Sequence, residues 1–118
     1  MMGKFSINIL LQSFNQTDDT PRESFENKIV LYDFEEDINN SCLKELIYKN
    51  NYEPAYKVAD GTVVYWQVVK IIDIFEIDSE IAFTNHTEVY SRFFIDQGSK
   101  KEILNNFFCD YIWEDQKG

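Results

Sequence analysis

The 118-residue chain carries 21 acidic against 11 basic side chains, so its formal net charge is −10, and 44 % of its residues are hydrophobic. This length fits one domain with its own core, and the 16 % of aromatic residues argues against a disordered chain, which is poor in large apolar side chains. The acidic balance argues against a nucleic-acid binder, because such a protein holds phosphates through clustered Lys and Arg.

The N-terminal third predicts two strands. From Phe5 to Phe14, apolar and polar residues alternate with the period of two that is typical of a half-buried strand. A second strand is predicted over about Phe25 to Phe34, with Val30 and Tyr32 on the same face. The polar stretch from Asn15 to Pro21 predicts an exposed loop, and two strands joined in this way pair antiparallel.

A helix is predicted from Asp37 to Lys49, because Ile38, Cys42 and Leu46 recur at helical spacing, with Leu43 and Ile47 beside this stripe. The acidic residues before it and the lysines toward its end complement the helix dipole. Asn50 and Asn51 are expected to close the helix, since Asn tolerates the left-handed conformation of a C-terminal cap.

The C-terminal half predicts three further strands. A hairpin turns at Asp60-Gly61 and leads into a strand of some 14 residues from Thr62, long enough to expect a bulge or a sharp bend. This strand has apolar residues on both faces, which indicates a central position in the sheet. A loop from Asp78 to Thr87 and a last strand from Glu88 to Ile95 follow.

The final helix has its own start signal, a capping box formed by Ser99 and Glu102. Its apolar stripe must bury against the sheet and comprises Ile103, Leu104, Phe107, Phe108, Tyr111 and Ile112. The predicted order is β-β-α-β-β-β-α over a single domain, residues 1–118. We therefore expect an α+β fold, an antiparallel sheet of about five strands that carries two helices on one face.

No catalytic or cofactor signature emerges. His86 is the sole histidine, and four glycines cannot build a phosphate-cradling loop, so we predict no enzyme, no cofactor and no metal. We expect no signal peptide, because the start of the sequence leads directly into alternating residues without a long apolar stretch. The apolar run from Val63 to Ile77 is too short and too charged to span a bilayer. Cys42 and Cys109 lack metal-binding spacing and are predicted to be free buried thiols, so the protein is expected in the cytoplasm.

Two segments resemble a known family. They are Tyr65-Trp66-Gln67-Val68-Val69-Lys70-Ile71-Ile72-Asp73-Ile74-Phe75-Glu76-Ile77 and Thr87-Glu88-Val89-Tyr90-Ser91-Arg92-Phe93-Phe94. Preceded by a segment like Ile29-Val30-Leu31, they resemble the DUF4288 family of small bacterial proteins over about residues 4–95. The stretch from Glu88 to Phe94 is the most specific part. The resemblance supports the strand order, and because the family's function is unknown it implies no catalytic residues.

Within the last strand, Glu88, Tyr90 and Arg92 are expected to project from one face. They could form a polar recognition patch, in which the guanidinium grips a carboxylate in a bidentate manner. The interpretation that we favour is a structural network, in which Arg92 pairs with a carboxylate such as Asp73 on a neighbouring strand.

Two functional classes remain open. The first is an acidic cytoplasmic protein that binds a basic partner, most specifically an immunity protein that neutralises a nuclease-type bacterial toxin in contact-dependent growth inhibition or a similar system. Its candidate contact residues are the exposed acids Asp18, Asp19, Glu35, Glu36, Asp78, Glu80 and Asp96. The second is a small-ligand or enzymatic domain with a pocket near Trp66, Tyr90 and Arg92. A homodimer through the last helix is possible but not indicated, and the charge could also serve solubility alone.

Overall fold

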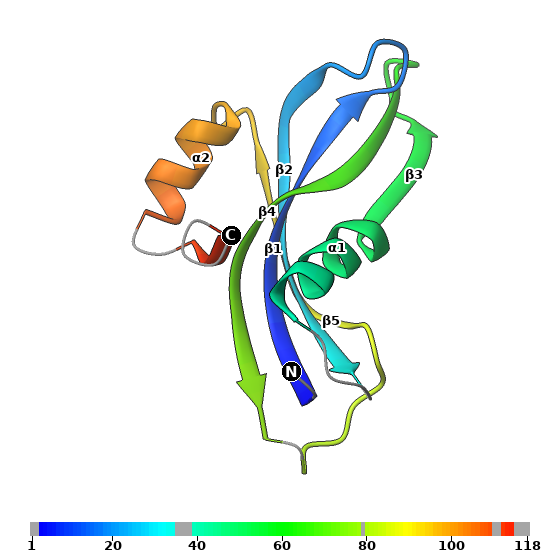
Figure 1. Cartoon of the computed structure of the whole chain (residues 1–118). Helices are drawn as coiled ribbons and strands as arrows, with labels where there is room; N and C mark the ends of the chain where they lie inside the picture. The colour runs from blue at the N-terminus through cyan, green and yellow to red at the C-terminus, as the bar shows by residue number, and fades with distance from the viewer. Residues whose placement is uncertain (1–2, 35–38, 79, 110–111, 115–118) are drawn as a thin grey trace.

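The computed structural model describes residues 3–34, 39–78, 80–109 and 112–114. Within these ranges, five strands form one antiparallel sheet in the order β3-β4-β1-β2-β5, and two helices pack on it (Figure 1). The strands are β1 (Gly3–Asn15), β2 (Pro21–Phe34), β3 (Tyr52–Lys57), β4 (Val63–Ile77) and β5 (Thr87–Ile95). The helices are α1 (Asn40–Asn50) and α2 (Lys100–Phe107), so the predicted α+β fold and element order are confirmed.

The central strand of the sheet is β1, which pairs with β2 on one side and with β4 on the other. Its alternation predicts burial on one face, yet Leu10 and Gln12 on the other face are buried as well as Ile9 and Leu11. Buried polar groups must find partners, and the Gln12 amide donates to the carbonyl of Arg22 at 2.8 Å. Both faces of β1 are therefore covered.

The two helices cover opposite faces of the sheet, which corrects the prediction that both lie on one. Leu43 and Ile47 of α1 pack in a cluster with the odd-numbered residues of β1, from Phe5 to Leu11. Ile103 of α2 packs in a second cluster with Leu10, together with Phe25, Ile72 and Phe94. Because neighbouring residues of a strand point to opposite faces, these two clusters lie on opposite sides of β1.

The first helix begins later than predicted. Asn39 caps it by accepting from the Cys42 amide at 2.8 Å, and residues 35–38, which include the expected start, lie outside the described part of the chain. The predicted stripe was wrong: Leu43 and Ile47 are buried, whereas Cys42 is exposed. Asn51 ends the helix at a negative φ, and its side chain closes it by donating to the carbonyl of Ile47 at 2.9 Å.

The second helix has the predicted capping box of Ser99 and Glu102 but ends at Phe107, so Ile112 lies beyond it. Tyr111 is outside the described residues. The chain then reaches the α1 side of the sheet, where Trp113 is buried in the first cluster. Cys109 is exposed, so the prediction of buried thiols was wrong for both cysteines, which form no disulfide. Neither helix described here is long and apolar enough to cross a membrane.

One carboxylate anchors this C-terminal segment. Glu114 accepts hydrogen bonds from the Tyr48 hydroxyl at 2.5 Å and from the backbone amide of Ile71, and it pairs with Lys44 at 3.3 Å. Its side chain is only 9 % exposed. Burial and the hydrogen bond to this carboxylate raise the pKa of Tyr48 far above its usual value. Glu114 thus ties the end of the chain to α1 and β4.

The strand boundaries differ from the prediction mainly at the turns. The second strand begins at Pro21 rather than Phe25, and five residues, 58–62, join β3 to β4 in place of a two-residue turn. Gly61 adopts a φ of +89° in this loop, a conformation that favours glycine. The predicted bulge in β4 is confirmed, since its register against β1 shifts twice, between Asn8 and Ile9 and between Leu10 and Leu11.

The sheet is strongly curled, so that strands far apart in the strand order meet on its concave, α1-bearing face (Figure 1). The ring of Trp66 in β4 packs edge-on against Phe93 in β5 at 5.9 Å between centroids. Lys28 of β2 contacts Glu53 of β3 at 3.3 Å. The Lys28 ammonium also lies 3.6 Å from Glu88 of β5, so side chains of both edge strands reach Lys28 on the concave face.

Candidate functional site

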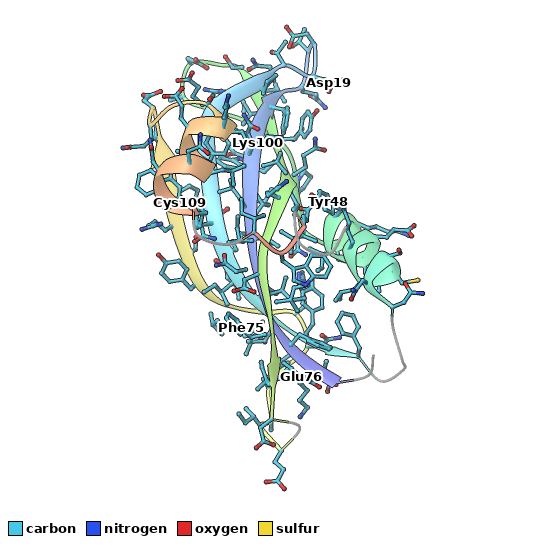
Figure 2. The ribbon with its side chains drawn as sticks, turned by 60° about the vertical axis from the view of Figure 1, so that its left-hand side comes forward. Asp19, Tyr48, Phe75, Glu76, Lys100 and Cys109 are labelled. Atoms are coloured by element: carbon cyan, nitrogen blue, oxygen red, sulfur yellow. The ribbon has the colours of Figure 1, made fainter. Side chains whose placement is uncertain are left out.

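Five of the seven acidic residues predicted to contact a partner belong to the described part of the chain, and these five fall at two opposite ends of a molecule 46 Å long. Asp18 and Asp19 lie in the turn between β1 and β2, at the end that Figure 2 marks with Asp19. Asp96 lies toward the same end, where its amide donates to the carbonyl of Glu23 at 3.0 Å. Asp78 and Glu80 lie in the loop after β4, at the other end. The predicted residues thus do not form one patch.

At the first end, which we call the hairpin end, the acids are engaged in local hydrogen bonds. Asp18 accepts from the hydroxyl and the amide of Thr20 at 2.7 and 3.2 Å, and these bonds lower the pKa of Asp18. Asp19 accepts from the Tyr65 hydroxyl at 2.7 Å, which raises the pKa of that tyrosine. These carboxylates hold the hairpin together, which accounts for their presence without a partner.

At the second end, exposed acids and exposed apolar side chains follow one another along the end of β4 and the loop after it. We define the loop-end surface as Phe75, Glu76, Asp78, Glu80 and Ile81, all of them exposed. Figure 2 labels Phe75 and Glu76 of this surface. Phe75 is 62 % exposed and Ile81 51 % exposed. Asp78 holds the loop in shape by accepting from the Glu80 amide at 2.9 Å.

Among the described residues, Lys4 brings a positive charge to this end. The Lys4 ammonium donates to the carbonyl of Ile81 at 2.6 Å and lies 5.4 Å from the ring centre of Phe83. The loop also connects to β2, since the Asn85 side chain accepts from the amide of Asp33 at 3.0 Å. Glu35 and Glu36, the remaining predicted contacts, are outside the described residues.

A second cluster of charged groups, not predicted from the sequence, lies on the concave face. We define the Lys28 cluster as Glu26, Lys28, Glu53, Glu88 and Ser91. The Lys28 ammonium lies 3.7 Å from Glu26, 3.3 Å from Glu53 and 3.6 Å from Glu88. The Ser91 hydroxyl donates to the other oxygen of Glu26 at 2.6 Å. Strands β2, β3 and β5 all contribute to it.

The charges in this cluster are unequally buried. The side chains of Glu26 and Lys28 are 5 % and 15 % exposed, whereas those of Glu53 and Glu88 are 40 % and 46 % exposed. Burial raises the pKa of Glu26, against the hydrogen bond from Ser91 and the charge of Lys28. Burial alone would lower the pKa of Lys28, but the three carboxylates outweigh it and the pKa is raised. One oxygen of Glu26 is buried without a hydrogen bond, so Lys28 is what compensates its charge.

A small cavity of about 110 Å³ adjoins the cluster. It is lined by Lys28, Val30, Asn50, Asn51, His86 and Glu88. The Asn51 amide donates to the Tyr32 hydroxyl at 2.6 Å, and its oxygen lies 2.9 Å from Nε2 of His86. The volume is well below the roughly 300–1,000 Å³ of ordinary ligand pockets. These contacts join the end of α1 to β2 and to the loop before β5, which is a structural role.

The predicted pocket near Trp66, Tyr90 and Arg92 is not formed. Trp66 is 6 % exposed on the concave face, and its indole N–H donates to the Tyr56 hydroxyl at 2.7 Å. The Arg92 guanidinium lies over Phe94, 4.5 Å from its ring centre, and Phe94 packs with α2 on the opposite face. The three side chains therefore do not converge.

The shared face expected for Glu88, Tyr90 and Arg92 was also wrong. The register of β5 against β2 shifts between its pairs with Ile29 and Val30, so Glu88 turns to Lys28 on the concave face while Arg92 lies on the other. The expected pair of Arg92 with Asp73 was wrong as well, because β4 and β5 are separated by two strands. Asp73 instead accepts from the amide of Ile74 at 2.8 Å.

One signal for the Lys28 cluster was present in the sequence. The face of β2 that carries Val30 and Tyr32 continues backward to Lys28 and Glu26, so charged residues occupy an otherwise apolar face. Charges at such positions indicate pairing, because a buried charge without a partner is costly. The partner residues Glu53 and Glu88 could not be identified in this way, since only the curl of the sheet brings them together.

In comparisons with known proteins, no family model, no curated protein and no solved structure matches this chain. The resemblance to the DUF4288 family stays a prediction.

Proposed function

We propose that the protein is an acidic binding protein of the bacterial cytoplasm that neutralises a basic protein partner, a toxin of the nuclease type, by direct contact through the loop-end surface. The observation that carries the proposal is the exposure of Phe75 and Ile81 beside Glu76, Asp78 and Glu80. Apolar side chains that are open to water supply binding energy when they are covered. Carboxylates around them attract a partner of opposite sign.

The chemistry suits a nuclease toxin in particular. A nuclease binds the phosphates of its substrate with Lys and Arg, and a protein that presents carboxylates can occupy the same surface. The net charge of −10 accelerates such an association over long range, while the apolar residues determine how slowly the complex dissociates. This division of roles explains why both kinds of residue are needed at one end of the molecule.

The two ends of the molecule provide a matched comparison. The double variant Asp78→Lys/Glu80→Lys reverses charge on the loop-end surface, and Asp18→Lys/Asp19→Lys makes the same change at the hairpin end. Binding to a basic toxin encoded beside the gene would be measured by surface plasmon resonance over a series of salt concentrations. The loop-end variant is expected to lower the association rate by about tenfold or more, and the native association is expected to slow as salt rises.

Two results would contradict the proposal. Equal loss of binding in the two double variants would show that the loop-end surface is not the contact. A failure of the native protein to bind the toxin, or to protect cells that produce it, would remove the function itself. Far-UV circular dichroism of each variant controls for misfolding.

A further inference from the structure

The outer edge of β5 is the least protected edge of the sheet. β5 is the terminal strand in the order β3-β4-β1-β2-β5, and seven of its nine residues, Glu88 to Phe93 and Ile95, are exposed. They include Val89, Phe93 and Ile95, at 55 %, 56 % and 60 % exposure, and Tyr90 at 41 %. An edge strand with exposed apolar side chains and unpaired backbone groups is a template for another strand.

The opposite edge shows the usual protection. β3 has only six residues and contains Pro54, which cannot donate a hydrogen bond, with Glu53 and Lys57 as charged neighbours. In β5 the only irregularity is the register shift beside Val89, so the segment from Ser91 to Ile95 remains regular. A pairing partner would therefore meet β5 at this segment.

The direction of the backbone groups follows from one hydrogen bond. The Asp96 amide donates to Glu23 of β2 at 3.0 Å, and backbone groups alternate in direction along a strand. The backbone amides and carbonyls of Phe94 and Arg92 therefore also point toward β2. The amides and carbonyls of Ser91, Phe93 and Ile95 face outward, away from the described sheet.

We propose that β5 pairs antiparallel with β5 of a second copy of this chain, about a two-fold axis centred on Phe93. In this register Phe93 faces its own equivalent, and each Ser91 faces Ile95 of the other copy, so all three outward-facing residues of each strand form backbone hydrogen bonds. In this register Phe93 of each strand is the diagonal neighbour of Ile95 of the other, so the two Phe93 and two Ile95 side chains lie together on one face of the sheet. This inference goes beyond the proposed function and does not depend on it.

The charges of β5 fit a second copy of itself. On the other face, the same register places Arg92 opposite Phe94 and Tyr90 opposite Asp96, so no like charges are paired. Arg92 already lies over Phe94 within the chain, and it would keep that contact beside the new strand. Such an isologous interface is closed, since each edge is used once and no further copy can add.

The first experiment compares two substitutions at similarly exposed apolar side chains. Ile95→Lys places a charge in the proposed interface, and Phe75→Lys, at a site 62 % exposed, places the same charge at the loop end. Analytical ultracentrifugation over a wide concentration series is expected to show a monomer–dimer equilibrium for the native protein and for Phe75→Lys. Ile95→Lys is expected to weaken dimerisation by about tenfold or more, a loss of about 1.4 kcal/mol or more. A native protein that remains monomeric throughout, or equal effects of the two variants, would overturn the proposal.

The second experiment tests the register. In a Cys42→Ser/Cys109→Ser background, Phe93→Cys places two thiols across the two-fold axis, where Cα atoms about 5.5 Å apart permit a disulfide. Mild oxidation is expected to give a covalent dimer that keeps the native circular dichroism spectrum. Ile81→Cys, at a residue 51 % exposed against 56 % for Phe93 but in the loop after β4, serves as the control. Equal cross-linking of Ile81→Cys would overturn the register.

Salt separates this inference from the proposed function. Two chains of net charge −10 repel each other, so dimerisation is expected to strengthen as salt rises. Association with a basic partner is expected to weaken over the same series. Weakening of the dimer by salt would contradict pairing between two acidic chains, whereas failure to bind a toxin would leave the dimer measurement intact.

Discussion

The substitution Lys28→Met tests how the fold compensates a buried charge. It retains most of the apolar stem of the lysine but removes the ammonium that lies 3.7 Å from Glu26. Glu26 is 4 % exposed, and one of its oxygens has no hydrogen bond. The variant therefore leaves a buried carboxylate without its counter-charge, which is among the most destabilising changes in a protein interior.

The size of the effect follows from the separations and the exposure. At 3.7 Å, the attraction between Lys28 and Glu26 is about 4–5 kcal/mol with an effective dielectric constant of about 20. Glu53 and Glu88 are 40 % and 46 % exposed, so they rehydrate when Lys28 is lost, and each contributes at most about 1 kcal/mol. We expect Lys28→Met to lower the free energy of unfolding by about 3–5 kcal/mol, out of the roughly 5–15 kcal/mol typical of a domain.

The pH dependence has a definite sign. Burial raises the folded-state pKa of Glu26 above the ordinary value of 4.5, and loss of the Lys28 charge raises it further. The destabilisation by Lys28→Met is therefore complete above this raised pKa, where Glu26 is ionised in the folded state. It decreases as the pH falls toward 4.5, because a protonated Glu26 needs no counter-charge.

Urea unfolding monitored by circular dichroism measures these free energies, at neutral pH and again near pH 4.5. Glu26→Gln is the matched variant, since it keeps the shape of Glu26 and removes the charge that Lys28 compensates. The double variant Glu26→Gln/Lys28→Met is expected to recover most of the lost stability. A loss that is independent of pH, or a double variant no more stable than Lys28→Met, would refute the electrostatic explanation.

Three further changes test other parts of the structure. Glu114→Ala should lower the free energy of unfolding by about 2–4 kcal/mol, because it leaves the hydroxyl of half-buried Tyr48 without its hydrogen-bond acceptor. Urea unfolding measures this loss, and a loss below about 1 kcal/mol would contradict the anchoring role. Gly98→Ala should destabilise by about 1–3 kcal/mol in the same assay, since its φ is +116° and the added Cβ would lie 2.9 Å from Glu102 of the capping box. Cys42 and Cys109 are exposed, so both should react with a thiol reagent without denaturant; protection of either would contradict the fold at that position.

The strands could be predicted from the sequence because alternation of apolar and polar residues marks a face directly. The order of elements and the capping box at Ser99 were confirmed for the same reason, since each depends on residues close in the chain. The sequence pattern did not determine which face of α1 is buried. Leu43 and Ile47 repeat at helical spacing, as do Cys42 and Leu46, and only packing against β1 selects the first pair.

The sequence contained one local indication that the helices lie on opposite faces of the sheet, but it was not enough to predict this placement. Leu10 stands among the polar residues of β1, where a half-buried strand would present a polar side chain, and it lies in the cluster that α2 covers. One apolar residue on the outer face is common in an exposed strand, so it does not establish a second helical layer. The path of the C-terminal segment to the α1 side depends on Trp113 and Glu114, whose partners are distant in the sequence.

For the candidate sites too, the sequence predicts some properties of single residues but not how distant residues are grouped. Exposed acids such as Asp78 and Glu80 could be predicted from their place in a polar loop, but not their separation from Asp18 and Asp19. That separation follows from the hairpin of β1 and β2, which sends its turn to the end opposite the loop after β4. Sequence position alone therefore gives the exposure of a charge but not which charges act together.

The curl of the sheet assigns different roles to the two sides of β5. On the concave side, Glu88 contacts Lys28 and Ser91 donates to Glu26, which ties β5 to β2. Lys28 also contacts Glu53 of β3. These contacts fix the strand without using its outer edge, so a second copy could pair there with little rearrangement. An antiparallel pair about Phe93 would direct the two loop-end surfaces in opposite directions along the strands. This arrangement would keep their negative charges far apart and leave each surface open to a basic partner.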